Sequence, residues 1–328
     1  MNTSTTTRRA LCLALLAAAA GTTCAQPGER FPSRPIKIIV AFAPGTGSDT
    51  VARIVAGAMG AALGQSVIVE NHSGAAGTLG TEQGAHAAAD GYTLTLATTS
   101  TLLTNPALNP KLRYRPDKDF VPVAGLARTP FVLVTADTAD TPHSLSELKA
   151  RLAGAGGAFG SSGTGTIGHL AAEYFVREAG VKAVHVPYRG SGQALSDVAG
   201  GQLMFACDTV AAALPLIRGG KLRALAVSAP RHLAALPGVP TGAEAGMPSF
   251  ELSAWWGLVA PAGTPPAAVA ALSDAVLKAL AAPEVRQTLD AQQLEPLPLG
   301  AAAFGALMHD EAPFWSGFVR RSGIRLDS

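Results

Sequence analysis

Short apolar runs and helical periodicities alternate along most of the 328-residue chain. A continuous apolar stretch such as 38–42 is typical of a buried parallel strand, because both faces of such a strand are covered. Segments with apolar residues three and four positions apart, such as 50–63, predict amphipathic helices. The alternation of the two patterns predicts an α/β fold.

The predicted elements form two sets, and the second set opens near residue 131. The strands are expected at 38–42, 66–69, 92–97, 131–135, 158–160, 184–186, 203–206, 222–227 and 255–260. The helices are expected at about 50–63, 81–89, 145–152, 167–179, 193–199, 210–218, 266–280, 283–292 and 301–318.

The first 25 residues have the pattern of a cleaved secretory signal peptide. Arg8 and Arg9 precede an apolar run at 10–20, and small residues follow up to Ala25. This run is too short to span a bilayer, which needs about 20 apolar residues. We therefore expect cleavage after Ala25, export to the periplasm and a soluble mature chain. Cys207 would then be the one remaining cysteine, so the fold would have no internal disulfide.

Composition excludes two classes of protein. Hydrophobic residues make up 48% of the chain, and 25 Lys and Arg face 23 Asp and Glu. Such a chain is too apolar to be disordered. The balanced charge also argues against a nucleic-acid-binding protein, which would carry a basic surplus.

Four loops rich in glycine and hydroxyl groups follow predicted strands, at 45–49, 73–77, 98–101 and 161–166. Ligands of open α/β sheets bind beyond the carboxyl ends of the strands. Glycine lets the backbone approach a ligand, and the helix starts supply free N–H groups and partial positive charge. Together these features favour a small anion. The alternative is that the Ser, Thr and Asp residues only cap helices.

Motifs for catalysis or cofactor binding are missing. Gly163, Gly165 and Gly168 form a G-x-G-x-x-G pattern, but no acidic residue ends the next strand, as a dinucleotide site requires. The sequence has neither a Walker loop nor a G-x-S-x-G elbow, and its seven histidines have no metal-ligand spacing. We expect no enzyme activity, no cofactor and no metal. His169 is interpreted as a packing residue or a ligand neighbour, and Cys207 as a small buried residue.

Several stretches between Phe31 and Ile324 have specific motifs, and the most specific is His185-Val-Pro-Tyr-Arg-Gly-Ser-Gly192. The others are 69–71, 89–94, 118–123, 219–227, 235–241 and 258–265. Together these stretches resemble the Bug family, the periplasmic substrate-binding proteins of tripartite tricarboxylate transporters.

The resemblance implies a two-lobed type II periplasmic-binding fold with a ligand cleft between the lobes. Lobe 1 would comprise 26–127 and 250–328, and lobe 2 would comprise 128–249. The implied function is to bind a small carboxylate by lobe closure, as a monomer, and to deliver it to the membrane subunits of the transporter. The predicted ligand-binding residues are Phe42, Pro44, Gly45, Thr46, Gly47, Ser48, Asp49, Ser73, Gly74, Ala75, Gly77, Thr98, Thr99, Ser100, Ser161, Ser162, Gly163, Thr164, Gly165, Thr166, His169, Tyr188, Arg189, Gly190 and Asp208.

Three questions stay open at the level of sequence. Thr46 stands where the family usually has a second glycine, and Thr209 where it often has asparagine, so the carboxylate is not identified. A sensory receptor that presents its ligand to a membrane sensor would share the same binding chemistry. An exported α/β hydrolase would need a nucleophile and a base in contact.

Overall fold

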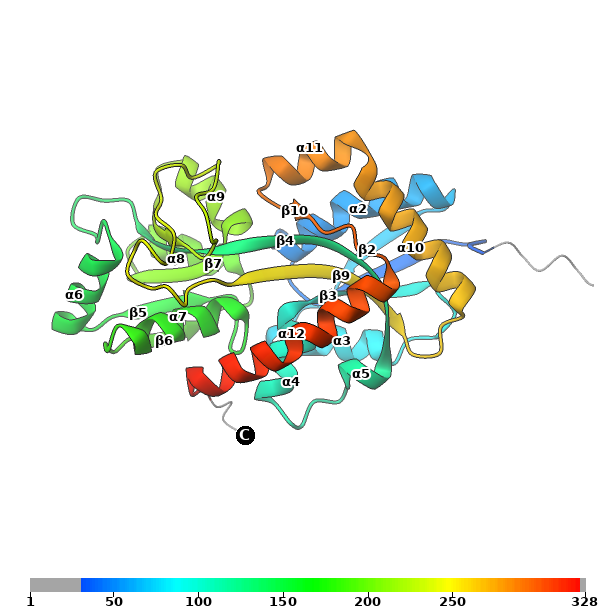
Figure 1. Ribbon diagram of the computed structural model, residues 1–328, viewed down its shortest axis with the longest axis horizontal. Coiled ribbons are helices and arrows are strands. Elements are labelled where there is room, and N and C mark those ends of the chain that lie inside the picture. The colour runs from blue at the N-terminus through cyan, green and yellow to red at the C-terminus, as the bar shows by residue number, and fades with distance from the viewer. Residues whose placement is uncertain (1–30, 325–328) are drawn as a thin grey trace, which may run out of the picture. The chain divides into compact units, whose positions relative to one another are not determined.

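The computed structural model describes residues 31–324 (Figure 1). The predicted signal peptide, residues 1–25, lies outside the described residues. The fold described below belongs to the compact unit that begins at Arg34. Among the described residues, no helix has the length and apolar character needed to cross a membrane.

Parallel and antiparallel strands alternate with helices, as the sequence pattern predicts. The strands are β1 (Ile36–Val40), β2 (Val67–Asn71), β3 (Thr93–Thr98), β4 (Phe120–Ala136), β5 (Ala158–Ser161), β6 (Val184–Pro187), β7 (Phe205–Thr209), β8 (Leu222–Val227), β9 (Ser253–Pro261) and β10 (Glu295–Pro296). The helices are α2 (Gly47–Leu63), α3 (Thr78–Ala85), α4 (Asn105–Leu108), α5 (Pro116–Asp119), α6 (Leu145–Ala155), α7 (Ile167–Glu178), α8 (Ser191–Ala199), α9 (Val210–Arg218), α10 (Pro266–Ala281), α11 (Pro283–Ala291) and α12 (Ala301–Ser322). Two further segments are helical but not α-helical: η1 (Ala75–Gly77) is a 3-10 helix, and η2 (Ser100–Thr104) is a π-helix.

The long strand β4 belongs to both halves of the sheet, whose strand order is β2-β1-β3-β9-β4-β7-β5-β6. Its first part, up to Pro130, pairs with β9, which in turn pairs with β3. Its second part, from Phe131, pairs with β7 and β8. Figure 1 shows β4 and β9 running side by side between the two halves. These crossing strands create the two-lobed architecture.

The predicted lobe boundaries lie close to these crossings. The boundary at 127/128 falls within β4, and the boundary at 249/250 lies shortly before β9. We retain both positions as a proposal.

The main difference from the sequence prediction is the start of β4, at Phe120 rather than 131. Pro122, Gly125 and Pro130 are unusual in a strand, so the sequence pattern does not predict the first half of β4. The structure accommodates the first two with register shifts near Pro122 and Gly125, where β4 bulges against β9. Helix α3 begins and ends earlier than predicted, and the short segments η2, α4 and α5 were not predicted.

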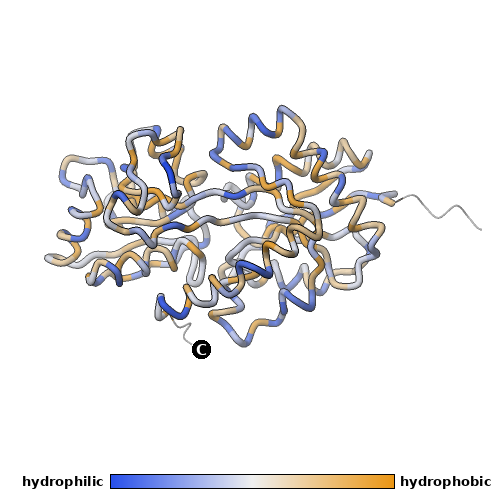
Figure 2. The backbone as a smooth tube through the Cα atoms, in the orientation of Figure 1, coloured by the Kyte–Doolittle hydropathy of each residue, from blue (hydrophilic) through white to orange (hydrophobic). Residues whose placement is uncertain are grey.

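Hydrophobic residues concentrate in the strands and on the inner sides of the helices, whereas outer segments such as α11 are hydrophilic (Figure 2). In β1, the consecutive residues Ile38, Ile39 and Val40 are buried, so both faces of the strand are covered. This burial explains the continuous apolar runs in the sequence, because a strand covered on both faces has no polar side to alternate with.

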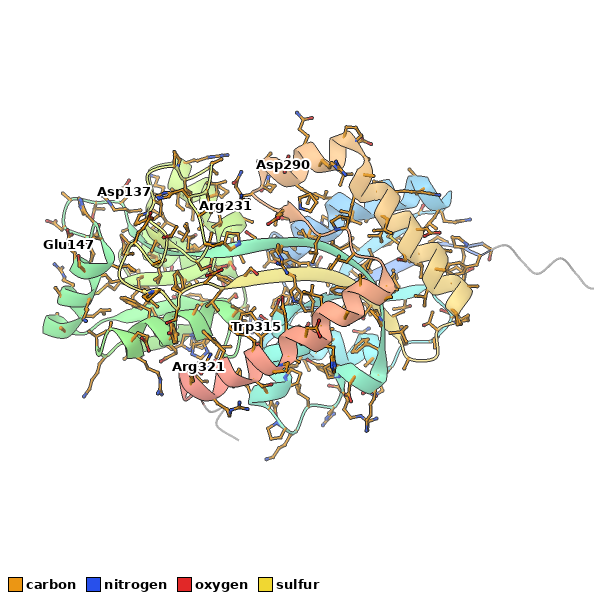
Figure 3. The ribbon with its side chains drawn as sticks, in the orientation of Figure 1. Asp137, Glu147, Arg231, Asp290, Trp315 and Arg321 are labelled. Carbon is orange, nitrogen blue, oxygen red and sulfur yellow. The ribbon has the colours of Figure 1, made fainter. Side chains whose placement is uncertain are left out.

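Helix α12 is tied to both crossing strands through one carboxylate. Glu311 accepts hydrogen bonds from Trp255 Nε1 of β9 at 2.8 Å and from Trp315 Nε1 at 3.2 Å. It also pairs with Arg128 of β4, whose Nη2 lies 3.4 Å away. Figure 3 labels Trp315 on α12. Because Trp255 and Trp315 are both buried, Glu311 satisfies two indole donors that water does not reach.

We expect the substitution Glu311→Leu to lower the free energy of unfolding by about 2–4 kcal/mol, because it leaves two buried N–H donors without an acceptor. Glu311→Gln keeps one acceptor oxygen and should cost less. Urea denaturation followed by tryptophan fluorescence measures both.

The neighbouring Asp310 is exposed and provides a matched control. Asp310→Asn should change the stability by less than about 0.5 kcal/mol. A Glu311→Leu protein as stable as the wild type would show that the Glu311 contacts do not hold α12 to the crossing strands.

Candidate functional site

The ends of several strands and the beginnings of several helices surround a small cavity of about 60 Å³, here called the helix-end cavity. Segments from both proposed lobes form its wall: the start of α2 and the end of β3 from one, and the starts of α7, α8 and α9 from the other. The lining residues are Phe42, Thr46, Gly47, Ser48, Thr98, Thr99, Ser100, Phe131, Ser162, Thr166, Ile167, Gly168, Ser191, Asp208, Thr209, Ala254 and Trp256.

Four helices begin at this cavity. Thr46, Thr166 and Thr209 are the N-caps of α2, α7 and α9, and the hydroxyl of each accepts a backbone N–H of its own helix. Helix α8 begins at Ser191, which also lines the cavity. The first N–H groups of a helix have no acceptor within it, and they carry partial positive charge. The cavity therefore attracts a negatively charged group.

Glycine allows two of these helices to begin so close to the cavity. A Cβ atom on Gly168 would lie 2.5 Å from the carbonyl oxygen of Cys207, a distance that no side chain tolerates. A Cβ atom on Gly47 would lie 3.2 Å from the ring of Trp256. The same ring donates a hydrogen bond from Nε1 to Ser48 Oγ at 2.9 Å. The crossing strand β9 thus fixes the start of α2.

A larger pocket of about 730 Å³, here called the outer pocket, adjoins the helix-end cavity, since Phe42 and Ser162 line both. Its wall combines apolar side chains with polar groups, among them the exposed Arg189. The remaining lining residues are Ala41, Ser73, Gly74, Ala75, Ala76, Gly77, Thr78, Leu79, Asn105, Asn109, Gly163, Thr164, Pro187 and Tyr188.

Hydrogen bonds join the loops of the two proposed lobes beside the helix-end cavity. Thr104 Oγ1 donates to the carbonyl oxygen of Gly165 at 2.9 Å. The N–H of Ile167, in the first turn of α7, donates to Ser100 Oγ at 3.3 Å. The loop at 161–166 with the start of α7 and the segment η2, which follows β3, therefore lie together, although more than sixty residues separate them in the sequence.

Most of the predicted ligand-binding residues line one of the two pockets. Those at the helix-end cavity are Phe42, Thr46, Gly47, Ser48, Thr98, Thr99, Ser100, Ser162, Thr166 and Asp208. Those at the outer pocket are Phe42, Ser73, Gly74, Ala75, Gly77, Ser162, Gly163, Thr164, Tyr188 and Arg189. The remaining predicted residues, which line neither pocket, are Pro44, Gly45, Asp49, Ser161, Gly165, His169 and Gly190.

Asp49 braces the first loop. Its carboxylate accepts hydrogen bonds from the N–H of Gly45 and from Asn71 Nδ2, both at 3.0 Å, and pairs with Arg53 at 2.9 Å. Burial by itself would raise the pKa of Asp49, but the hydrogen bonds from Arg53, Gly45 and Asn71 hold it below the usual value. Asn71 Nδ2 also donates to the carbonyl oxygen of Phe42. The end of β2 thus fixes the loop that precedes α2.

Two stacked histidines hold the loop at 161–166 from behind. The rings of His169 and His185 lie 3.7 Å apart. His169 Nδ1 accepts the N–H of Gly165 at 3.0 Å, and His185 Nε2 lies 2.7 Å from Ser161 Oγ. Burial lowers the pKa of His185 to about 4. Burial and the adjacent His185 ring together lower the pKa of His169 to about 3. His169 is therefore a packing residue, one of the two interpretations of the sequence.

Other predicted residues also have partners away from the helix-end cavity. Tyr188 lines the outer pocket, and its hydroxyl donates to Asp197 of α8 at 2.5 Å. Cys207 is fully buried, as expected, and burial raises the pKa of its thiol well above the usual value. No group of three or more His, Cys, Asp or Glu residues within 31–324 is arranged to hold a metal.

Sequence reasoning missed several lining residues. Ser191 directly follows the predicted Gly190, and the same rule of strand ends and helix starts would have found it. Trp256 and Asn105 had no comparable signal, because one lies within an apolar strand and the other in a short helix after η2. The further residues missed are Phe131, Ile167, Gly168 and Ala254 at the helix-end cavity and Ala41, Ala76, Thr78, Leu79, Asn109 and Pro187 at the outer pocket.

Solved structures with the same fold define the class of the protein. The periplasmic binding protein BugD is 31% identical, with a TM-score of 0.86 over 90% of this chain and 99% of BugD. MatC from Rhodopseudomonas palustris with bound malate is 36% identical, with a TM-score of 0.82 over 88% of this chain and 100% of MatC. An R. palustris protein with adipate is 30% identical, with a TM-score of 0.85 over 90% of this chain and 99% of that protein. The fold is that of a two-lobed periplasmic binding protein.

Sequence comparison identifies the family. Residues 51–324 match the model of the tripartite tricarboxylate transporter family receptor. The protein BugT from Bordetella pertussis is 36% identical over 326 residues, which cover 98% of this chain and 99% of BugT. The chain belongs to the tripartite tricarboxylate transporter receptor family, and the resemblance to Bug proteins is confirmed.

The neutral histidine pair predicts a loss of stability in mild acid. Because burial lowers the pKa of His169 and His185, the unfolded chain binds more protons at these sites below about pH 6.5. The free energy of unfolding should therefore decrease as pH falls from about 6.5 towards the folded pKa values. Between about pH 4.5 and 6, we expect His169→Gln to reduce the slope of stability against pH by about 1 kcal/mol per unit. Urea denaturation at several pH values measures this slope.

His232 is half exposed and pairs with Glu244 away from the site, so His232→Gln serves as the control. This variant should keep the slope of the wild type in the same pH range. Equal slopes for His169→Gln and the wild type would contradict a neutral, buried His169.

Proposed function

We propose that the protein is a periplasmic receptor that binds a small carboxylate-bearing organic anion between its two lobes and delivers it to a tripartite tricarboxylate-type membrane transporter. The observation that carries the proposal is the convergence of four helix N-termini and several hydroxyl groups on one small cavity. A carboxylate is small enough for this cavity, and its oxygens accept hydrogen bonds from N–H and O–H groups alike.

The available interactions match the affinity that a receptor needs. Micromolar binding requires about −8.2 kcal/mol. Hydrogen bonds to a charged group contribute roughly 1.5–3 kcal/mol each. A helix N-terminus adds roughly 0.3–1 kcal/mol, and up to about 2 in a partly buried site. A few hydrogen bonds and the four helix ends therefore reach the required scale before the costs of ordering the ligand are subtracted.

Binding by lobe closure explains why both lobes contribute to the wall. In this proposal, the ligand first meets one lobe, and closure brings the N–H and hydroxyl groups of the other lobe against it. The hydrogen bonds from Thr104 to Gly165 and from Ile167 to Ser100 then hold the closed form. The carboxylate occupies the helix-end cavity, and the rest of the ligand extends into the outer pocket.

Two structural relatives support a carboxylate ligand, since MatC holds malate and the other R. palustris protein holds adipate. Both are 30% or more identical to this chain and share its fold over nearly the whole length. Malate and adipate are therefore the first compounds to test with this protein.

The contact between Ser161 and His185 does not support a hydrolase. Ser161 Oγ lies 2.7 Å from His185 Nε2, but Ser161 is fully buried and lines neither pocket. A nucleophile must meet its substrate. The same contact explains the loop geometry instead, since Ser161 Oγ also accepts the N–H of Gly163. A sensory role would use the same site, and co-purification with membrane subunits would separate it from transport.

A thermal-shift screen of residues 26–328 tests the proposed function. The protein is unfolded and refolded first to remove any bound compound, and it is then mixed with malate, adipate, their amides and neutral sugars. Ligand at about 100 times its dissociation constant stabilises the folded state by about 2.7 kcal/mol. We expect a shift with an acid and none with its amide. A shift with a sugar but with neither acid would contradict the proposal.

Ser162 and Thr164 provide a more local test, since Ser162 lines both pockets and Thr164 the outer one. The double substitution Ser162→Ala and Thr164→Ala removes two hydroxyl donors and should weaken carboxylate binding by at least about tenfold. Because neither side chain is fully buried, the stability of the free protein should change by less than about 1 kcal/mol. Isothermal titration calorimetry measures the affinity.

The control is Thr138→Ala with Ser146→Ala, a pair of exposed residues of lobe 2 outside both pockets. This pair should bind as the wild type does. If Ser162→Ala with Thr164→Ala also bound normally, the loop at 161–166 would not contact the ligand.

A further inference from the structure

We infer that the Asp208 carboxyl group is protonated when a carboxylate occupies the helix-end cavity, so that binding takes up a proton from the solvent. This inference rests on the proposed function and specifies the chemistry of that site. It makes Asp208 a hydrogen-bond donor to the ligand rather than a negative charge that repels it.

The position of Asp208 is unusual for an anion-binding site. It lies near the end of β7 and lines the helix-end cavity, yet its side chain is buried, with 5% of the residue exposed. Its Oδ1 accepts the N–H of Thr209 at 2.7 Å, and the hydroxyl groups of Thr209 and Ser191 are its other close polar neighbours. A carboxyl group therefore shares a cavity of about 60 Å³ with the donors that attract the ligand.

Within residues 31–324, no cationic side chain pairs with Asp208 to offset a second negative charge. Burial raises the pKa of Asp208, and this effect exceeds the lowering by hydrogen bonds from Ser191 and Thr209. No charged side chain in the described part of the chain contributes to the shift of this pKa. The titratable or charged groups on the elements packed around it are Arg128 on β4, Cys207 on β7, His169, Glu173, Tyr174, Arg177 and Glu178 on α7, Asp197 on α8, Arg218 on α9, and Asp49 and Arg53 on α2. Arg128 pairs with Glu311 of α12, and Arg177 and Glu178 are exposed. Among the others, Asp49 and Arg53 neutralise each other, Asp197 accepts from Tyr188, and Arg218 is exposed.

Two ionised carboxylates at such short range repel each other strongly, and the usual outcome is that they share one proton. The four helix N-termini favour negative charge in the cavity, but they do not remove the repulsion between two adjacent carboxylates. A protonated Asp208 beside an ionised ligand avoids this repulsion. The proton comes from the solvent, binds the Asp208 carboxylate, and is then donated in an O–H···O bond to a carboxylate oxygen of the ligand.

This arrangement couples affinity to pH. An ionised Asp208 has no proton to donate and repels the incoming carboxylate, so binding must supply the proton. Above the pKa of Asp208 in the free protein, the affinity should weaken by about tenfold for each pH unit. In Asp208→Asn, the amide supplies an N–H donor without any protonation step, and its oxygen can still accept the N–H of Thr209.

Calorimetric titration with malate and with adipate tests the inference between about pH 6.5 and 9. Titrations in buffers of different ionisation enthalpy give the number of protons taken up on binding. We expect the wild type to take up a fraction of a proton that approaches one as pH rises, with a parallel loss of affinity. Asp208→Asn should bind without proton uptake and with an affinity that does not depend on pH.

Glu173→Gln is the matched control, because burial also raises the pKa of Glu173, which lies in the same lobe but lines neither pocket. It should keep the proton uptake of the wild type. Binding by the wild type without proton uptake would overturn the inference and leave the proposed function standing. So would loss of binding in Asp208→Asn, which would show that an ionised Asp208 pairs with a donor on the ligand. If neither acid bound to the wild type at pH 6.5, the proposed function itself would fail.

Discussion

The unsatisfied N–H groups at the starts of four helices are the constraint on which the rest of the site depends. They meet at one cavity because the strands that precede them end there, and threonine side chains cap three of the four helices. Capping satisfies only part of the donors in each first turn. The remaining donors and the helix dipoles favour a negatively charged group in the cavity.

The crossing strands determine how these helix starts come together. Because β4 pairs with β9 in its first part and with β7 and β8 in its second, the two halves of the sheet share a continuous backbone. Trp256 of β9 reaches the first turn of α2, while Glu311 ties α12 to both crossing strands. The residues that position the site are therefore located in the strands that any movement of the lobes must bend.

The buried polar groups near the site have two different tasks. Asp49, Ser161 and His169 lie behind the loops and satisfy backbone N–H groups that would otherwise be unpaired. Ser48, Ser191 and Asp208 line the cavity itself. The first group gives the loops a fixed shape, which in the proposed function reduces the ordering cost of binding. In the same proposal, the second group sets which chemical group the cavity accepts.

The sequence by itself determined the α/β alternation, the loops at the strand ends and the threonine caps, because each depends on residues only a few positions apart. It also placed Thr46, Ser162 and Asp208 among the ligand-binding candidates, and all three line a pocket. Only the tertiary structure decided that Asp49 and His169 support loops instead, and that Trp256 and Asn105 line the pockets. It also revealed the first half of β4, whose prolines and glycine are tolerated through register shifts against β9. These features depend on partners distant in the sequence, and the spacing of neighbouring residues contains no record of such contacts.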